Sequence, residues 1–309
     1  MRFPLSLGGL FPLLLSQCTT CPADFRAVQA PAPILRAAQV NELSDCQVRH
    51  YGTTLLAHAP DLTVAEALLA RGARPNGKII ENQTVHEGTA LLYTRDNATI
   101  IALSRAGADV NRLSGSERHT PLCNAAAEGD LSRLNTLLAI GADPNRMDSR
   151  AASPLYLAAQ SRHAGACQQL LRRGANPDIG SMEEGASPLI GALRSGAPQG
   201  TLGAIVTELL TAGANPQLAD ATGRTPLHYA PAELVPTLTA AGASVHARDL
   251  EGRTPLFYCT TPAQAEALLN AGADINATDY RGHTPFDIVS SPQVKSFLLI
   301  RGANSGNPI

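Results

Sequence analysis

The sequence contains no tryptophan, and only 4% of its 309 residues are aromatic. Hydrophobic residues nevertheless make up 44% of the chain. Most of them are therefore alanine and leucine, which favour helices that pack closely through small contacts. A chain of this length is too long for one small core, so it predicts either two domains or a repeat array.

Charged residues are also scarce, at 16% of the chain, and the two signs nearly cancel. The chain has 24 basic and 26 acidic residues, so its net charge is −2. This balance argues against a polybasic surface of the kind that binds nucleic acid or anionic lipid. It also argues against a disordered chain, which would be poorer in apolar residues and further from neutrality.

The motifs of common catalytic and cofactor sites are missing. The chain has no G-x-S-x-G, no H-E-x-x-H and no G-x-G-x-x-G after a strand, and its eight histidines are scattered. The stretch 72–78 has phosphate-loop spacing, but Ile79 replaces the Ser or Thr that binds magnesium. Glu183 and Glu184 have no companion base. We therefore predict no catalytic residue, no metal site and no cofactor.

The first 18 residues have the pattern of an export signal. Arg2 precedes an apolar stretch over 3–15 that is shorter than the roughly 20 residues needed to span a bilayer. Leu15-Ser16-Gln17-Cys18 resembles the bacterial lipobox, in which the cysteine is lipidated, although Gln17 stands where Gly, Ala or Ser is expected. Lipidation at Cys18 and cleavage further on, after Ala23, both stay open. Either outcome predicts a protein that is exported to the periplasm or lipid-anchored at the cell envelope.

The segment after the signal contains two further cysteines. Cys18 and Cys21 form a C-x-x-C, but no second pair completes a zinc site. With Cys18 assigned to the lipid, Cys21 and Cys46 are candidates for a disulfide in an oxidising compartment. We expect residues 19–33, rich in Ala and Pro, to form a tether. Residues 34–51 are expected to form a helix that caps the structure following them.

Two landmarks then recur in fixed order along the chain. The first is a Gly-Ala pair at intervals of 29 to 39 residues, found at Gly72-Ala73, Gly107-Ala108, Gly141-Ala142, Gly174-Ala175, Gly213-Ala214, Gly242-Ala243, Gly272-Ala273 and Gly302-Ala303. The second lies upstream and reads Thr or Ser, Pro, then Leu or Phe, as at Thr120-Pro121-Leu122, Ser153-Pro154-Leu155, Ser187-Pro188-Leu189, Thr225-Pro226-Leu227, Thr254-Pro255-Leu256 and Thr284-Pro285-Phe286. Such order indicates a repeat protein.

The pattern resembles the ankyrin repeat family, whose unit of about 33 residues opens its first helix with T-P-L-H-x-A. Here Thr225-Pro226-Leu227-His228 keeps the first four residues of that motif. The resemblance covers residues 52–304. It implies an all-α solenoid of about eight helix-turn-helix repeats joined by β-hairpin loops. Residues 305–309 are expected to fray.

Each landmark also has a physical role of its own. Thr or Ser caps the first helix, and Pro follows at its first position, where a missing N–H costs nothing. Gly supplies the left-handed turn after the second helix, and the Leu-Leu pairs before it are expected to face the core. Cys123, Cys167 and Cys259 fall at apolar positions of the repeat, so we interpret them as buried structural residues. His228 is expected to tie neighbouring turns together.

Several repeats depart from the family length. In the short ones a proline, at Pro60, Pro231, Pro262 or Pro292, follows the cap residue closely, which predicts an early second helix and a shortened first one. The repeat from Ser187 to Gly213 is longer, and its extra residues 195–200 predict a protruding loop. The hairpin over 76–87 is also longer than the family norm.

The resemblance places function on the surface, because ankyrin proteins bind partners through their hairpin tips and a concave helix face. The residues at matching positions are Arg112, Arg118, Arg146, Met147, Met182, Glu183, Asp249, Leu250, Tyr280 and Arg281. Arg, Met and Tyr are enriched at interface cores. Each of these residues taken alone is better interpreted as a solvated turn residue, and only the set as a whole suggests a binding surface.

We therefore expect a non-enzymatic, monomeric protein-binding module of the cell envelope. Its role would be that of an antitoxin or immunity protein, or of an assistant to a periplasmic enzyme, and it would bind no nucleic acid. The membrane would be contacted only through an N-terminal lipid. Two alternatives stay open: a secreted effector that binds host proteins, and an enzyme with an unrecognised site in the 76–87 or 195–200 insertions.

Overall fold

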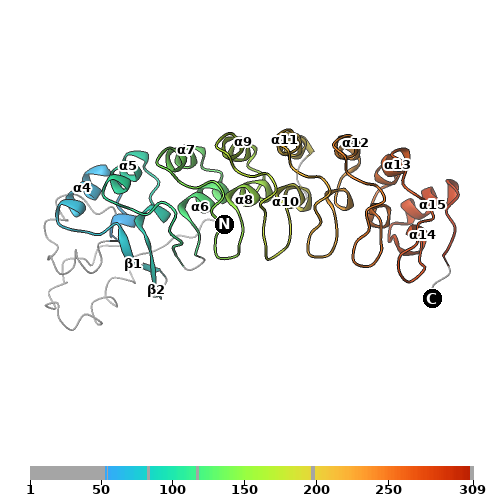
Figure 1. Ribbon diagram of the computed structural model, residues 1–309, viewed down its shortest axis with the longest axis horizontal. Coiled ribbons are helices and arrows are strands. Elements are labelled where there is room, and N and C mark those ends of the chain that lie inside the picture. The colour runs from blue at the N-terminus through green and yellow to red at the C-terminus, as the bar shows by residue number, and fades with distance from the viewer. Residues whose placement is uncertain (1–52, 54, 82–83, 116–117, 196–198, 307–309) are drawn as a thin grey trace. The chain divides into compact units, whose positions relative to one another are not determined.

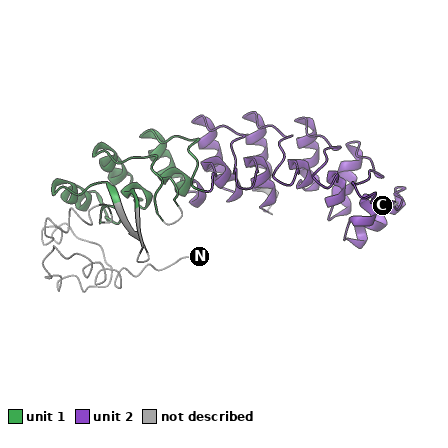
Figure 2. Cartoon of the chain, turned by 60° about the horizontal axis from the view of Figure 1, so that its bottom comes forward, with its two compact units in different colours: residues 1–125, 130–149 green, residues 126–129, 150–309 purple. Residues whose placement is uncertain are grey.

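The computed structural model describes residues 53, 55–81, 84–115, 118–195 and 199–306 (Figure 1). The predicted signal, tether and capping helix over 1–51 lie outside this range, as do Cys18, Cys21 and Cys46. The described chain divides into two compact units (Figure 2). Unit 1 comprises residues 1–125 and 130–149, and unit 2 comprises residues 126–129 and 150–309.

Unit 1 combines helices with the one sheet found in the described residues. Its elements are α4 (Leu62–Ala70), β1 (Asn76–Glu81), β2 (Thr84–Thr89), the 3₁₀ helix η2 (Ala90–Leu92), α5 (Asn97–Arg105), α7 (Leu131–Ala139) and the first part of α6 (Pro121–Glu128). The strands pair antiparallel from Asn76 opposite Thr89 to Glu81 opposite Thr84, which confirms the long hairpin. Helix α5 packs against both α4 and α7. The core of the unit consists of fully buried leucines and isoleucine, such as Leu68, Ile100 and Leu134.

Unit 2 is built from pairs of helices in which the first helix has seven residues in the first two pairs and only three or four in the later ones. Its elements are α8 (Pro154–Gln160), α9 (Ala164–Arg172), α10 (Pro188–Arg194), α11 (Gln199–Thr211), η3 (Pro226–His228), η4 (Ala232–Leu234), α12 (Val235–Ala240), η5 (Pro255–Tyr258), α13 (Pro262–Asn270), α14 (Pro285–Ile288) and α15 (Pro292–Ile300). Second helices pack on one another, α9 on α11 and α13 on both α12 and α15.

The predicted caps are confirmed at Thr120 and Ser153 but not at Thr254, whose hydroxyl makes no capping bond. The shortened first helices are confirmed before Pro262 and Pro292. The hydroxyl oxygen of Ser153 accepts a hydrogen bond from the Tyr156 N–H at 3.0 Å, and that of Thr120 accepts from the Cys123 N–H at 3.0 Å. Pro262 and Pro292 each stand at the start of a second helix, and the first helices before them, η5 and α14, have only four residues each. Early prolines therefore shorten the first helix because they fix where the second begins.

The Gly-Ala landmark ends each second helix as expected. All eight of its glycines have φ between +84° and +99°, the left-handed region that only glycine enters without strain. The alanine that follows donates its N–H to a carbonyl five residues back, as from Ala73 to Leu68 at 3.0 Å, which is the Schellman bond. A Cβ at Gly72 would meet no atom within 4 Å, so backbone conformation, not space, requires glycine here.

Polar residues just after the Gly-Ala pair connect successive repeats. The side-chain oxygen of Asn76 accepts from the Asp109 N–H at 2.8 Å, and that of Asn111 accepts from the Asp143 N–H at 2.9 Å, both within unit 1. In unit 2, Asn276 accepts from the Asn304 N–H at 2.8 Å. These bonds satisfy backbone groups at the turns, so the landmark fixes stacking as well as the helix end.

Three expectations need correction or refinement. In most Leu-Leu pairs only the first leucine is fully buried; Leu298 is 0% exposed but Leu299 is 60% exposed, because successive residues on a helix lie 100° apart. The predicted loop over 195–200 is shorter than expected, since Gln199 and Gly200 already belong to α11. Ser305 and Gly306 are not loose, because both donate hydrogen bonds to the Asp287 carboxylate, at 2.7 and 2.8 Å.

Candidate functional site

Three hairpin tips of unit 2 are turns organised by an aspartate. The Asp249 carboxylate accepts from the backbone N–H groups of Glu251 and Arg253, both at 2.9 Å. Asp220 and Asp279 make the same pair of bonds within their own tips. The glycine that follows, as at Gly252, has a φ of +80°. The pattern Asp-x-x-Gly therefore specifies the turn and leaves the two residues between them to project outward.

Asp249 was predicted to contact a partner, and the structure contradicts this. Asp249 is only 4% exposed. In addition to the two backbone N–H groups, its carboxylate accepts a hydrogen bond from the Tyr258 hydroxyl. Burial raises the pKa of Asp249, but the hydrogen bonds from Tyr258 and the backbone outweigh this and hold that pKa below its usual value of 3.8. Asp249 is a structural residue because its carboxylate is consumed inside the turn.

Successive tips of unit 2 are linked backbone to backbone. The N–H of Leu250 donates to the carbonyl of Thr222 at 3.1 Å, and the N–H of Tyr280 donates to that of Glu251 at 3.0 Å. The N–H of Ala221 donates to Glu184 at 3.1 Å in the same way. A Cβ on Gly252 would lie 2.7 Å from the Tyr280 ring. The tips are thus held in a fixed series, and each glycine admits the residue of the next tip.

Three of these linked tips expose a large apolar side chain. Met182 is 73% exposed, Leu250 is 71% exposed and Tyr280 is 68% exposed. Each of the three directly follows the first residue of its turn, respectively Ser181, Asp249 and Asp279, so they occupy equivalent positions. Apolar exposure at one repeated position is unlike the scattered single residues of an ordinary surface. We call these three side chains the apolar tips.

A polar network behind the tips was missed at the sequence level. The Tyr229 hydroxyl donates to Asp220 at 2.6 Å, and the Tyr258 hydroxyl bonds Asp249 in the next repeat. The Arg224 guanidinium lies 4.0 Å from the centre of the Tyr258 ring and donates to its hydroxyl at 2.9 Å. The signal was an Asp and a Tyr nine residues apart in two consecutive repeats.

His228 has the structural role that was expected. Its Nδ1 accepts from the Thr225 N–H at 3.0 Å, and its Nε2 lies 3.1 Å from the Arg253 carbonyl of the next repeat. The residue is 3% exposed. Burial lowers the pKa of His228 below 6.5, so the neutral ring joins the two turns.

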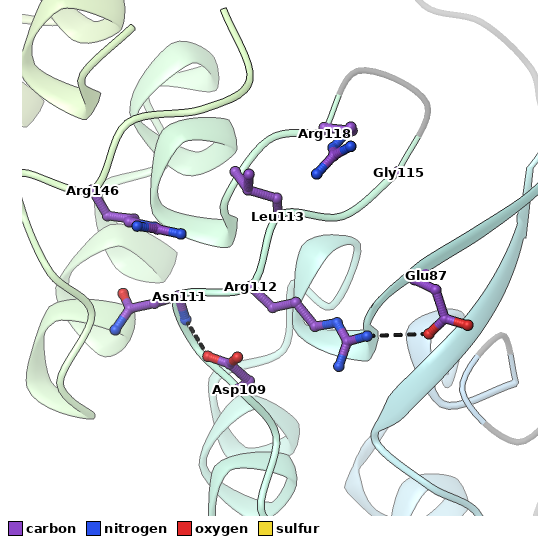
Figure 3. A pocket seen from close by; sticks show the side chains of 8 residues that line it. All are labelled: Glu87, Asp109, Asn111, Arg112, Leu113, Gly115, Arg118 and Arg146. Carbon is purple, nitrogen blue, oxygen red and sulfur yellow. Dashed lines mark hydrogen bonds and ion pairs between the residues drawn. The ribbon is translucent and has the colours of Figure 1, made fainter. Parts of the chain in front are cut away.

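In unit 1 the arginines predicted at the tips surround one hollow (Figure 3). Arg112, Arg118 and Arg146 line it together with Glu87, Asp109, Asn111, Leu113 and Gly115, and its volume is about 510 Å³. Arg112 forms an ion pair with Glu87 at 3.1 Å. The structure therefore brings together three predicted residues that are up to 34 positions apart in sequence.

The other predicted partner-binding residues belong to neither group, although each directly follows a member of one. Glu183 and Arg281 are exposed in tips of unit 2, and Met147 is half-buried in unit 1. The predicted lipidation of Cys18 and the Cys21–Cys46 disulfide fall outside the described residues and stay predictions.

The three described cysteines are buried, as predicted. Burial raises the pKa of each of Cys123, Cys167 and Cys259 to about 12. Their thiols therefore stay protonated at neutral pH, when they would have to be thiolates to act as nucleophiles or metal ligands. Across the described residues, no group of three or more His, Cys, Asp and Glu side chains is arranged to hold a metal ion.

Comparison with known proteins identifies the repeat. The family model for ankyrin repeats (3 copies) matches residues 90–181, 122–202 and 196–279, which together span more than half of the chain. The chain belongs to the ankyrin repeat family. The all-α solenoid predicted from the sequence is thereby confirmed, and ankyrin repeats are protein–protein interaction modules that typically act as non-enzymatic scaffolds.

Individual ankyrin proteins resemble parts of this chain. It is 30% identical over 139 residues to Ankyrin repeat protein nuc-2 of Neurospora crassa, an alignment that covers 44% of this chain but only 12% of that protein. The crystal structure of the human ASB11 ankyrin repeat domain superposes with a TM-score of 0.54 at 26% identity, covering 67% of this chain and 94% of that domain. Within the described part of this ankyrin protein, every helix is too short or too polar to cross a membrane.

Proposed function

We propose that this ankyrin protein binds a partner protein through the apolar tips of unit 2 and acts by stoichiometric occupancy. The observation that carries this proposal is the exposure of Met182, Leu250 and Tyr280 at equivalent positions of linked tips. Aromatic residues and methionine are enriched at the cores of protein interfaces. Apolar side chains repeated along an edge would each enter a pocket or groove of the partner.

The backbone bonds between tips support a preformed binding surface. Leu250 and Tyr280 stand on turns whose backbone is bonded both internally and to the preceding tip. Binding then orders few additional bonds, and a rigid surface loses less conformational entropy than a flexible loop. The apolar contacts made by the tips can therefore contribute to binding affinity without a large loss of conformational entropy.

The setting that we propose is the bacterial cell envelope. The positive start at Arg2, the apolar stretch 3–15 and the lipobox-like sequence ending at Cys18 support export. In that compartment the protein would serve as an antitoxin or immunity protein, or assist a periplasmic enzyme. Both roles require one tightly bound partner and no catalysis by this chain.

The proposal is tested by affinity capture of partners from a cell-envelope extract with the full chain. The test variant combines Met182→Ser, Leu250→Ser and Tyr280→Ser. The matched control combines Leu299→Ser and Ile300→Ser, which also remove exposed apolar side chains of unit 2, 60% and 83% exposed, but on helix α15.

We expect the unmodified chain and the control to retain one dominant protein at near-equal stoichiometry and the test variant to lose it. Thermal unfolding of all three chains must coincide, because exposed substitutions of this kind change stability little. Equal capture by the test variant would refute binding through the apolar tips. Loss of capture in the control as well would show that general surface apolarity, not tip position, drives retention.

A further inference from the structure

The arginine hollow of unit 1 has two guanidinium groups that the fold leaves unused. Arg118 and Arg146 are exposed, and their side chains make no hydrogen bond or ion pair with any described residue. Both still face the same hollow, as Figure 3 shows, from different turns of the chain. Structural arginines in this unit behave differently: the Arg133 guanidinium is buried and bonded to Asn124 at 2.7 Å.

The ion pair formed by Arg112 lies at the protein surface. Its guanidinium pairs with Glu87 at 3.1 Å, and the two side chains are 35% and 64% exposed. Ion pairs with this exposure contribute little to stability because water screens them. An incoming anion can therefore replace Glu87 on Arg112 without disturbing the fold.

The backbone that carries these arginines is held in place. Arg118 has a φ of +52°, which is strained for a residue with a side chain. Its carbonyl accepts from the Ser149 N–H and its own N–H donates to the Gly115 carbonyl, both at 3.2 Å. The Arg146 carbonyl accepts from the buried Cys123 thiol at 3.5 Å. These hydrogen bonds fix the backbone positions from which the two guanidinium groups extend.

The charges of the lining favour an anion. Three guanidinium groups face two carboxylates, those of Glu87 and Asp109. Asp109 already accepts from the backbone N–H of Asn111 at 2.9 Å, a contact drawn in Figure 3. With all five groups ionised, the lining carries a net charge of one positive unit, and the guanidinium groups without a carboxylate partner among the described residues are those of Arg118 and Arg146.

We propose that this hollow binds an acidic segment of the partner polypeptide, with Asp or Glu carboxylates on Arg118 and Arg146. Guanidinium groups hold carboxylates through paired, charge-assisted hydrogen bonds. A volume of about 510 Å³ accommodates several side chains, and Leu113 in the lining offers an apolar contact for their methylene groups. Glu87 competes with the ligand for Arg112. This inference rests on the proposed protein-binding function and specifies the chemistry of a second contact.

The direct test measures binding of a blocked hexaglutamate peptide to the full chain by fluorescence anisotropy at low salt, with a hexaglutamine peptide as the neutral probe. The variants are Arg118→Gln, Arg146→Gln and Glu87→Gln. The matched control is Arg105→Gln, since Arg105 is an exposed arginine of unit 1 that does not line the hollow.

We expect hexaglutamate but not hexaglutamine to bind. Arg118→Gln and Arg146→Gln should each lower the affinity by up to about fivefold, as expected for exposed ion pairs. Glu87→Gln should raise the affinity by a similar factor because it removes a competing carboxylate, while Arg105→Gln changes nothing. An equal loss in Arg105→Gln would overturn the proposal, since attraction would then follow net charge. Inorganic phosphate that binds with the same arginine dependence while the peptide does not would overturn it in favour of a small-anion site.

Capture of the partner separates this inference from the proposal on which it rests. If the Arg118→Gln, Arg146→Gln double variant captures the partner as well as the unmodified chain while the apolar-tip variant does not, the hollow has no part in binding and the tip proposal stands. If the double variant loses the partner and the apolar-tip variant keeps it, the hollow is confirmed as a contact and the tip proposal fails.

Discussion

The two compact units expose opposite chemistry at their hairpins. Unit 1 gathers Arg112, Arg118 and Arg146 around a polar hollow, whereas unit 2 exposes Met182, Leu250 and Tyr280 along linked tips. Within the tips of unit 2, the residues that make the turn are the aspartate and the glycine, and the side chains between them project outward. A repeat can therefore change its surface chemistry without changing its fold.

The units also differ in how adjacent repeats are joined. In unit 1 the buried guanidinium of Arg133 reaches back to the carbonyls of Leu91 and Leu92, which belong to the 3₁₀ helix η2. In unit 2 neutral His228 and the contact of the Arg224 guanidinium with Tyr258 make these connections between short first helices. A first helix that is reduced to one turn buries little apolar surface, so side-chain hydrogen bonds contribute more of the cohesion there.

The largest effect is expected from Arg133→Met. This change leaves the carbonyls of Leu91 and Leu92 and the Asn124 side chain without their buried donor, so unit 1 should lose about 3–5 kcal/mol of stability. Hydrogen exchange followed by mass spectrometry should show reduced protection in α5 and α7, and much less change in α13 and α15, because stability in repeat proteins is local. Arg105→Met is the control at an exposed position. Equal loss of protection in both units would show that they do not unfold separately.

A smaller loss, about 2 kcal/mol, is expected in unit 2 from His228→Ala, which removes the bonds to Thr225 and Arg253. Burial lowers the pKa of His228, so the unfolded chain, with a pKa near 6.5, takes up a proton that the folded chain refuses. The stabilisation is thus complete above pH 6.5 and is lost as the pH falls below it. Denaturant unfolding at pH 7.5 and 5.5 should show this dependence in the unmodified chain and in His246→Ala, an exposed control, and weaker dependence in His228→Ala.

The structural role of a residue in this protein could be predicted from the sequence where the residue behaves as its type usually does. Thr120, Ser153 and the left-handed glycines act as their types normally do, and the repeat pattern located them correctly. Arg133 could not be predicted as a core residue because arginine is almost never fully buried unless paired. Its partners, the carbonyls of Leu91 and Leu92, lie in another repeat.

Asp249 was misassigned for a related reason. Its place in a tip predicted exposure, but its burial depends on Arg253 and Tyr258, which lie four and nine residues further on and become neighbours only when the tip folds. The arginine hollow could be predicted from the sequence only in part. Its three arginines were selected one by one as tip residues, whereas their convergence depends on the stacking of turns around Asp109, Arg118 and Arg146.

Asp249→Asn should cost about 1–2 kcal/mol at neutral pH, because the amide cannot accept from both the backbone and the Tyr258 hydroxyl as the carboxylate does. Because hydrogen bonds lower the pKa of Asp249 despite its burial, its contribution is present above its usual pKa of 3.8 and is lost as the pH falls through the lower folded value. Acid unfolding followed by circular dichroism should thus be shallower in the variant. Asp274→Asn, at an exposed position of the same unit, should retain the acid dependence of the unmodified chain.

The smallest effect on stability is expected where the two units differ most in surface chemistry. Leu250→Arg gives an apolar tip of unit 2 the chemistry of unit 1, and it should change the free energy of unfolding by no more than about 0.5 kcal/mol, because the Leu250 side chain is 71% exposed. Gly252→Ala, two residues away, is the contrasting variant. Its φ of +80° and the Tyr280 ring 2.7 Å from the new Cβ should together cost about 1–3 kcal/mol. Equal losses in the two variants, measured by urea denaturation, would mean that the tip side chains hold the turns together, and surface chemistry could then not vary independently of the fold.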